Sequence, residues 1–517
     1  MFSTITSGAI YGINSYLTQV EVDTAQGLPG FDMVGFLGNE VKEARERVRV
    51  ALKNAGLNLP AMRITVNISP ANIRKDGTAF DLPIAIGILV SMNILPADSV
   101  KDILFLGELG LSGEVKFVRG VLPIVMEAKK YGITKFIVPC DNRREGAVIH
   151  NVEVMGVRDV SQTILYLKAD YETRRKLLQQ AETEEKMQDE IIVPGQKNIE
   201  DFNEINGQES VKRAALVSAA GFHHILMIGP PGSGKTMIAK AIPSILPPLT
   251  MEESLEVSKI YSVSGMLSAR EAIIKKRPFL NPHHTITENA LAGGGRIPKP
   301  GVISLAHRGV LFLDELPEFR RSTLDILRQP LEDKKVQIAR NYGNYTYPAD
   351  FILVGAMNPC PCGYYPDPNK CRCTPFEVKR YMNRVSGPIL DRIDICTEAP
   401  KIDIKNLTEN RINETSQQMR NKVMEARERQ DFRFQNTGIM FNSQMGPKEI
   451  KNYCSLGLKE QAILERAFSK MNLSARGYHR IIKVARTIAD LEKEDTIKSI
   501  HLSEAICYRN NDQKYWC

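Results

Sequence analysis

The sequence predicts an α/β protein: a parallel sheet with flanking helices in the middle of the chain, an α+β domain before it and helices after it. Three observations support this fold class. Short apolar runs bounded by turn residues, typical of buried parallel strands, occupy 225–229, 310–313 and 351–355. Residues 1–168 alternate strand-like and helix-like segments. Residues 401–517 are charged and mostly helical in pattern, as at 458–471 and 478–491.

The domain borders follow from changes in composition. Within residues 1–168, the pattern of a strand occurs at 63–68 and 103–106. Helical periodicity occurs at 41–55 and 120–131. Residues 169–198 are highly charged and poor in apolar side chains, which predicts a solvated linker or an exposed helix. The sheet-based core is therefore expected at 199–400 and a helical C-terminal domain at 401–517.

The composition is that of a soluble globular protein, because 43% of the residues are apolar and 25% are charged. No apolar run reaches membrane-spanning length and the first residues do not form a signal peptide, so a cytoplasmic protein with no membrane partner is expected. Nine cysteines, an odd number, do not match a secreted disulfide framework. The net charge of +8 permits nucleic-acid binding and fits an ordinary mixed surface equally well.

A glycine-rich loop follows the apolar run that ends at residue 228, and a helical pattern begins directly after it. The loop matches G-x-x-x-x-G-K-[ST] and consists of Gly229, Pro230, Pro231, Gly232, Ser233, Gly234, Lys235 and Thr236. Glycines allow backbone N–H groups to surround a polyphosphate, and the helix N-terminus favours its negative charge. Lys235 would reach the β- and γ-phosphates and Thr236 would bind Mg²⁺. An accidental glycine-rich turn is the alternative, but the strand–loop–helix context favours ATP or GTP binding.

Polar residues follow the next two apolar runs. Asp314 and Glu315 end the run at 310–313, where Asp314 would enter the Mg²⁺ shell and Glu315 would polarise a water that attacks the γ-phosphate. Two adjacent acids could instead begin a helix. Asn358 ends the next run and could position the attacking water, although alone it would be interpreted as a turn residue before Pro359. Together these residues predict nucleotide hydrolysis.

Four cysteines lie close together in a loop rich in Gly, Pro and Tyr, at 358–375. They are Cys360, Cys362, Cys371 and Cys373, a C-x-C pair followed after eight residues by a second C-x-C pair. Four thiolates can form a tetrahedral Zn²⁺ site, which would order a loop that has little apolar content. The alternatives are a redox pair or four free thiols. Structural zinc is the favoured interpretation.

These motifs together resemble the AAA+ ATPases of the clade that contains magnesium chelatase and the minichromosome-maintenance helicases, and within it the YifB/ComM family. The segments that carry the resemblance are 206–213, 281–285, 293–295, 309–319, 358–363 and 386–394. The family implies an AAA+ core with a C-terminal helical lid, assembled as a hexameric ring. It also implies that Arg392 is an arginine finger acting on the neighbouring subunit's γ-phosphate and that Arg476 is the sensor arginine of the lid. Either arginine alone could be a surface salt-bridge partner.

Residues 1–168 resemble the proteolytic domain of Lon-type proteases, whose fold is similar to that of ribosomal protein S5. The matching segments are 75–77, 107–114, 119–124 and 132–139. Lon-type enzymes require a nucleophilic Ser and a Lys at positions that carry Ala79 and Ala128 here, with Lys129 and Lys130 beside the latter. Without an activatable nucleophile no acyl chemistry is possible, so the domain is expected to be a scaffold or a DNA-contacting element.

Two basic segments are candidates for binding DNA. Residues 334–347 read as a hairpin with a Gly-Asn turn at Gly343 and basic residues near its tip. The second segment, residues 293–299, resembles the helix-2 insert of the clade and is also basic. The DNA-binding candidates are Arg296, Lys299, Lys334, Lys335 and Arg340. Contacts from these side chains to phosphates would be independent of sequence and sensitive to salt, whereas the alternative is a solvated hairpin.

Three functions are compatible with these motifs. The favoured one is an ATP-driven hexameric motor on single-stranded or branched DNA, a helicase or branch migrator, since ComM-like proteins are implied to act on recombination intermediates during natural transformation. The second is a chelatase-type remodeller that uses ATP on a protein partner for metal insertion. The third, an ATP-dependent peptidase, is disfavoured by Ala79. ATP and Mg²⁺ are the expected cofactors, with structural Zn²⁺.

Overall fold

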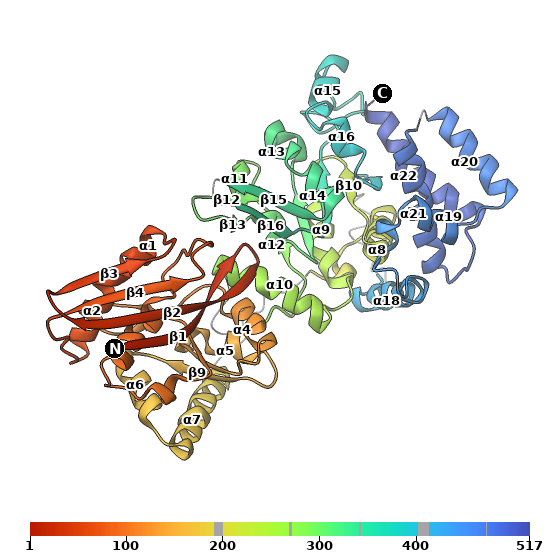
Figure 1. The fold of residues 1–517 in the computed structure, drawn as a ribbon. Helices are drawn as coiled ribbons and strands as arrows, with labels where there is room; N and C mark the ends of the chain where they lie inside the picture. The colour runs from red at the N-terminus through yellow and green to blue at the C-terminus, as the bar shows by residue number, and fades with distance from the viewer. Residues whose placement is uncertain (191–199, 268–270, 341–342, 402–412, 472, 517) are drawn as a thin grey trace.

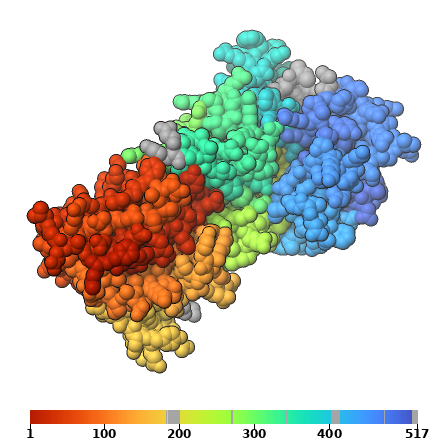
Figure 2. Space-filling model, viewed as in Figure 1, coloured from red at the N-terminus to blue at the C-terminus, as the bar shows by residue number. Residues whose placement is uncertain are grey.

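The computed structural model describes residues 1–190, 200–267, 271–340, 343–401, 413–471 and 473–516. An N-terminal domain lies at one end of the molecule, the core built on a parallel sheet lies in the middle and a helical domain lies at the other end (Figure 1). The space-filling view shows the N-terminal domain packed directly against the core (Figure 2). Over the described residues, none of the helices is both long and apolar enough to cross a membrane.

The N-terminal domain contains a mixed seven-stranded sheet in the order β3-β4-β2-β1-β5-β8-β9. Its strands are β1 (Phe2–Tyr11), β2 (Asn14–Gln26), β3 (Gly30–Val34), β4 (Met62–Ser69), β5 (Ile103–Phe105), β8 (Lys135–Pro139) and β9 (Glu153–Val157), with a small β6–β7 pair (Glu108–Leu109 and Val115–Lys116). Its helices are α1 (Asn39–Lys42), α2 (Ala44–Asn54), α3 (Asp81–Ser91), α4 (Val121–Lys130), α5 (Arg143–Ala147) and α6 (Val160–Lys168). Strands and helices therefore occur where the periodicity predicts them, and the domain is α+β.

Most of the segment predicted as a linker or an exposed helix is helical, because α7 covers Tyr171–Glu190. Leu177 and Leu178 pack against the core of the N-terminal domain. Arg174 donates hydrogen bonds to the carbonyl oxygens of Tyr166 and Ala169, at 3.0 and 3.1 Å. The first half of this helix thus belongs to the N-terminal domain. Residues 191–198 of the predicted linker lie outside the described part of the chain.

The central sheet has five strands in the order β11-β14-β17-β10-β18, and all of its pairs are parallel. The strands are β10 (Ile225–Ile228), β11 (Phe279–Leu280), β14 (Val310–Leu313), β17 (Ile352–Met357) and β18 (Ile395–Glu398). Strands β10, β14 and β17 are fully buried, which explains their continuous apolar runs. The predicted α/β fold class is confirmed.

Helices cover both faces of this sheet, and two small hairpins extend from it. The helices are α8 (Glu209–Gly221), α9 (Lys235–Ile245), α10 (Met251–Ser264), α11 (Glu288–Ala292), α12 (Val302–Leu305), α13 (Arg321–Asp325), α14 (Arg328–Asp333), α15 (Pro375–Met382) and α16 (Gly387–Leu390). The hairpins are β12–β13 (Gly293–Gly294 and Lys299–Pro300) and β15–β16 (Lys335–Arg340 and Gly343–Pro348).

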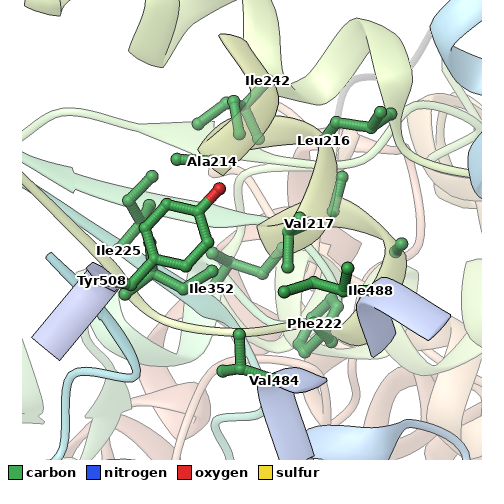
Figure 3. Packing of buried hydrophobic residues seen from close by; sticks show 14 of the residues in the cluster. Ala214, Leu216, Val217, Phe222, Ile225, Ile242, Ile352, Val484, Ile488 and Tyr508 are labelled. Atoms are coloured by element: carbon green, nitrogen blue, oxygen red, sulfur yellow. The ribbon is translucent and has the colours of Figure 1, made fainter. Parts of the chain in front are cut away.

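The C-terminal domain is helical, as predicted. It contains α18 (Ser416–Arg433), α19 (Pro447–Tyr453), α20 (Leu458–Lys470), α21 (Ala475–Leu491) and α22 (Ser499–Trp516). Apolar side chains of α21 and α22, including Val484 and Tyr508, pack against residues of α8, β10 and β17 (Figure 3). Arg509 also donates to the carbonyl oxygen of Ile393 at 2.7 Å. The helical domain is therefore held against the edge of the sheet that carries β18.

Candidate active site and metal sites

The phosphate loop lies between β10 and α9, as its sequence predicts. Gly229–Gly234 connect the strand to the helix, and Lys235 and Thr236 form the first turn of α9. Gly232 and Gly234 have φ angles of 75° and 82°, a left-handed conformation that other residues adopt only at an energetic cost. A Cβ atom at Gly229 would lie 2.2 Å from the carbonyl oxygen of Ala399. The loop therefore requires glycine for both its conformation and its packing.

The Lys235 side chain folds over this loop. Its Nζ donates to the carbonyl oxygens of Gly229 and Pro230, at 2.8 and 2.9 Å, and lies 3.4 Å from Oδ1 of Asn358. Burial lowers the pKa of Lys235 to about 8, because charge is costly in a partly desolvated site. Asn358, which follows β17, is thus next to the phosphate-binding lysine.

The residues predicted to bind Mg²⁺ lie together. Thr236 Oγ1 donates to Asp314 Oδ2 at 2.9 Å, and the backbone N–H of Glu315 donates to Asp314 Oδ1 at 2.9 Å. A hydroxyl and a carboxylate side by side at the carboxyl end of a strand form the oxygen-rich ligand set that Mg²⁺ prefers beside a phosphate loop. The geometry fits the metal: Thr236 and Asp314 would hold it next to Lys235.

Glu315 is the second acid at this edge of the sheet. Its side chain is 60% exposed, and its Oε2 lies 3.8 Å from Nδ1 of His284. His284 lies four residues after the end of β11, and its ring contacts that of His283 with a centroid separation of 4.1 Å and a tilt of 35°. The sequence interpretation used this His-His pair only as part of the family resemblance. A pair of histidines shortly after the Phe279–Leu280 strand, which pairs in parallel with the strand before Asp314, was the available signal for this contact.

The two candidate arginines bind the same carboxylate. Nη2 of Arg392 lies 2.7 Å from Glu332 Oε2, and Nη2 of Arg476 lies 3.2 Å from Glu332 Oε1. Arg392 also donates to the carbonyl oxygen of Pro388 at 2.6 Å and is only 8% exposed. Within the described residues, neither arginine hydrogen bonds to the phosphate loop. The structure therefore joins Arg392 and Arg476 through Glu332, a residue that the sequence interpretation missed.

The four cysteines of the loop between β17 and α15 converge. The Sγ atoms of Cys360 and Cys362 are 3.3 Å apart, and those of Cys360 and Cys371 are 3.8 Å apart. All four ligand atoms, including that of Cys373, lie within 4.8 Å of one another. This spacing is compatible with one tetrahedral metal ion, and thiolate ligands favour zinc over Mg²⁺. The loop also packs on the phosphate loop, since a Cβ atom at Gly363 would lie 2.6 Å from Cδ of Pro231.

The hairpin β15–β16 exists, but its predicted turn is wrong. Arg340 pairs with Gly343, so Gly343 and Asn344 belong to β16 and do not form the turn. Residues 341–342 lie outside the described part of the chain. The Gly-Asn pair matches a turn signature, but the strand register places it at the start of β16. Lys334 lies at the base of the hairpin, where its Nζ is 3.3 Å from Asp350 Oδ1.

The other DNA-binding candidates lie on neighbouring surfaces. Lys335, Arg340, Arg296 and Lys299 are exposed. Nε of Arg340 donates to the carbonyl oxygen of Gly295 at 3.4 Å, and the Tyr347 hydroxyl donates to the carbonyl oxygen of Pro298 at 2.8 Å. The hairpin and the 293–300 loop thus contact each other directly.

Alanine occupies both positions, 79 and 128, at which the resemblance to Lon-type proteases would require a catalytic side chain. Ala79 follows Thr78, whose hydroxyl donates to the Glu108 carboxylate. Ala128 is fully buried on α4, and Lys129 donates from the surface to the carbonyl oxygen of His150 at 2.7 Å. Neither a nucleophile at position 79 nor a lysine at position 128 is therefore present for acyl chemistry.

Three family models match successive parts of the chain. Residues 20–142 match the model described as subunit ChlI of Mg-chelatase, and residues 201–407 match magnesium chelatase, subunit ChlI. Residues 413–509 match the magnesium chelatase subunit ChlI C-terminal model. The matches follow the three structural domains described above.

Relatives match over nearly the full length. Competence protein ComM of Haemophilus influenzae is 43% identical over 97% of this chain and 96% of its own length. Protein YifB of Escherichia coli is 41% identical over 99% of this chain and 97% of its own. The magnesium-chelatase 38 kDa subunit of Rhodobacter capsulatus is 28% identical over 31% of this chain and 50% of its own. The phosphate loop, the acids beside it and these full-length matches show that the chain belongs to the ComM and YifB family of magnesium-chelatase-like AAA+ ATPases.

Proposed function

We propose that this protein is an ATP-hydrolysing motor that acts on DNA as a hexameric ring, as a helicase or a branch-migration enzyme. The observation that carries the proposal is the contact between Arg340 and Gly295, which joins the two basic segments into one surface on the ATPase core. Arg296, Lys299, Lys335 and Arg340 supply its positive charge. Contacts from such side chains to phosphates suit a motor that moves along DNA without reading its sequence.

The residues of the nucleotide site have separate roles in hydrolysis. Lys235 binds the β- and γ-phosphates and loses its hydrogen bonds to the loop carbonyls when it does so. Thr236 and Asp314 hold Mg²⁺, which neutralises charge on the phosphates when it is bound. Glu315 polarises the attacking water, and Asn358, beside Lys235, orients it.

Hydrolysis is completed by a neighbouring subunit. Arg392 of one subunit leaves Glu332 and stabilises the charge that develops on the γ-phosphate bound by the next subunit. Arg476 acts on the nucleotide of its own subunit. A ring therefore couples each turnover to the contact between two subunits.

The name of the Haemophilus relative, competence protein, supports a role in DNA uptake. The second candidate, a chelatase-type remodeller of a protein partner, is supported by the three chelatase family models, which match 20–142, 201–407 and 413–509. The chelatase subunit itself, however, is 28% identical over 31% of this chain, against 43% over 97% for the competence protein. The DNA motor is therefore the better-supported function.

The decisive measurement is the ATPase rate of the full chain with no DNA, with single-stranded DNA and with a branched junction, at about 50 mM and about 200 mM salt. A DNA motor should be stimulated by DNA, and its DNA affinity should fall steeply between the two salt concentrations. Unstimulated turnover and salt-independent binding would favour the remodeller. The matched control is Glu315→Gln, which should bind DNA and fail to hydrolyse ATP.

A further inference from the structure

A cavity of about 110 Å³ lies where the N-terminal domain meets the ATPase core. Its lining includes Tyr11, Ala79 and Arg119 from the N-terminal domain and Lys299 and Tyr345 from the two basic segments of the core. The cavity is therefore formed by three parts of the chain at once: the N-terminal domain around Ala79 and Arg119, the 293–300 loop and the β15–β16 hairpin. Figure 1 shows the β1–β2 pair reaching the core at this junction.

The junction is held by specific contacts. The Ser262 hydroxyl on α10 donates to the buried Glu145 carboxylate, and the backbone N–H of Gly120 donates to the carbonyl oxygen of Ser262 at 3.1 Å. The rings of Tyr11 and Tyr345 are in contact, with centroids 4.8 Å apart. These contacts connect both domains directly beside the cavity, so its walls are preformed.

Two cations in the cavity wall, Arg119 and Lys299, form no ion pair within the described part of the chain. Asp76 lines the cavity as well, but its carboxylate is paired with Arg74 at 2.9 Å. Over the described residues, the side chains of Arg119 and Lys299 form no hydrogen bond. Burial lowers the pKa of Lys299 and the charge of Arg119 lowers it further, whereas the Glu40 carboxylate raises it. The two cations are therefore close enough to repel each other.

Two unpaired cations held together are costly unless an anion binds between them. An arginine and a lysine that converge on a small cavity can donate several charge-assisted hydrogen bonds to one phosphate group. Lys299 lies in the same loop as Arg296, and Tyr345 lies in the same hairpin as Arg340. A nucleic-acid strand bound along those segments would pass the mouth of the cavity.

We propose that Arg119 and Lys299 bind a phosphate group at the domain junction and that this phosphate belongs to a single-stranded nucleic acid. The nucleic-acid source rests on the proposed function; the phosphate site itself does not. The N-terminal domain thereby contributes a nucleic-acid contact in the same cavity wall as Ala79. The Tyr11–Tyr345 pair in the wall, with its rings tilted by 34°, offers an aromatic surface for an adjacent base.

The test uses Arg119→Gln, Lys299→Gln and the double variant in the full chain. Glutamine removes the charge and keeps Cγ and Cδ, the atoms of Arg119 that lie nearest to Gly265. The matched control is Lys130→Gln, at the other end of α4, where the lysine pairs with Glu127 at 2.8 Å on the surface. Binding of labelled oligothymidylate is measured by fluorescence anisotropy over a range of salt concentrations, and thermal unfolding is measured in parallel.

Each single variant should weaken binding and reduce the slope of log affinity against log salt by about 0.7, the value for one phosphate contact on a single strand. The thermal midpoint should stay the same or rise, because removing one cation relieves repulsion. The control should match the wild type in both measurements. Unchanged oligothymidylate affinity in the double variant, while Arg340→Ala weakens binding, would overturn this inference and leave the proposed function standing.

A second arm measures pyrophosphate binding by calorimetry in the Lys235→Ala background, so that the phosphate loop does not contribute. If the protein binds no DNA, the DNA motor is rejected. Loss of pyrophosphate binding in the Arg119→Gln variant would then still support a phosphate site at the domain junction. If Arg119→Gln changes neither oligothymidylate nor pyrophosphate binding, the site does not exist.

Discussion

Arg392 is bound to Glu332 within its own subunit, with 2.7 Å between Nη2 and the carboxylate oxygen. The second oxygen of that carboxylate is bound by Arg476. An arginine that acts on a neighbouring nucleotide must first leave this partner. The partner is partly exposed, with 42% of the Glu332 side chain accessible, so the ion pair is weak enough to exchange for a phosphate.

Arg392→Ala should retain ATP binding and lose most hydrolysis, by about 10³-fold or more, because the missing guanidinium stabilises charge only in the transition state. Steady-state ATPase assays and nucleotide titrations measure the two effects separately. Mixing this variant with Lys235→Ala subunits tests the action between subunits. Each mixed ring then contains some intact sites, and activity should reappear; no recovery in the mixture would place Arg392 in its own subunit's site.

Glu332→Gln should shift the dependence of ATPase rate on protein concentration. The variant frees Arg392 and Arg476 from an ion pair worth about 0.5–1 kcal/mol at a partly exposed site. Productive subunit contacts should therefore form at about two- to fivefold lower protein concentration. The control is Glu318→Gln, which removes an exposed ion pair with Arg384 elsewhere on the core. Identical concentration curves for Glu332→Gln and the wild type would contradict the exchange.

ATP affinity should fall as the pH rises above about 8. Burial lowers the pKa of Lys235 to about 8, whereas bound phosphates favour its charged form, so binding above this pH takes up a proton. The expected decrease is up to about tenfold per pH unit, and below this pH the group contributes no dependence. Calorimetry at pH 9 in buffers of different ionisation enthalpy measures the proton uptake. Lys235→Arg, whose guanidinium stays charged, should show none.

The same pKa shift affects folding in the opposite pH direction. The unfolded chain binds the Lys235 proton more tightly than the folded chain, so this group destabilises the fold at low pH. Its penalty is relieved as the pH rises from about 8 towards the unfolded value near 10.5. Thermal unfolding of the wild type against Lys235→Met across this range isolates the contribution.

The purified wild-type protein should contain one zinc ion per chain, and Cys371→Ser should lose this zinc and have a lower thermal midpoint. Because Gly363 of the same loop packs on Pro231, nucleotide affinity should also decrease. Metal content by mass spectrometry, the thermal midpoint and nucleotide titration give three independent measurements. Cys507→Ser, at an exposed cysteine outside the cluster, is the control and should change none of them. Wild-type protein without bound metal would reject the site.

Arg340→Ala should weaken DNA binding equally for all sequences, whereas Lys334→Ala should have a smaller effect. Lys334 is already paired with Asp350 at the base of the hairpin, so less of its charge is available to a phosphate. Fluorescence anisotropy with several single-stranded sequences provides the comparison. A sequence-dependent loss in Arg340→Ala would indicate base contacts instead of phosphate contacts.

The features that could be predicted from the sequence are those that depend on residues adjacent in the chain. Continuous apolar runs predicted β10, β14 and β17, since a strand covered on both faces contains few polar residues. The phosphate loop was predictable because its glycines and lysine are adjacent in the chain. The acid pair at Asp314 was predictable because it ends one of those runs.

Contacts between distant segments could not be predicted in this way. Glu332 is a single exposed acid on a short helix, and nothing in its local sequence indicates that it joins Arg392 to Arg476. The Gly-Asn turn failed because the pairing of Arg340 with Gly343 fixes the register, and a dipeptide signature does not contain the register. The cavity at Arg119 depends on how two domains pack.

The close packing of Gly363 on Pro231 also constrains how this family can change over time. A side chain at position 363 would collide with Pro231, and its φ angle of 85° disfavours most residues as well. A substitution at either position therefore requires an accommodating change at the other, so the cysteine loop and the phosphate loop should accept mutations as a pair. Saturation mutagenesis of both positions should show strong epistasis in stability and ATPase activity: some double variants should be active although each of their single substitutions is not.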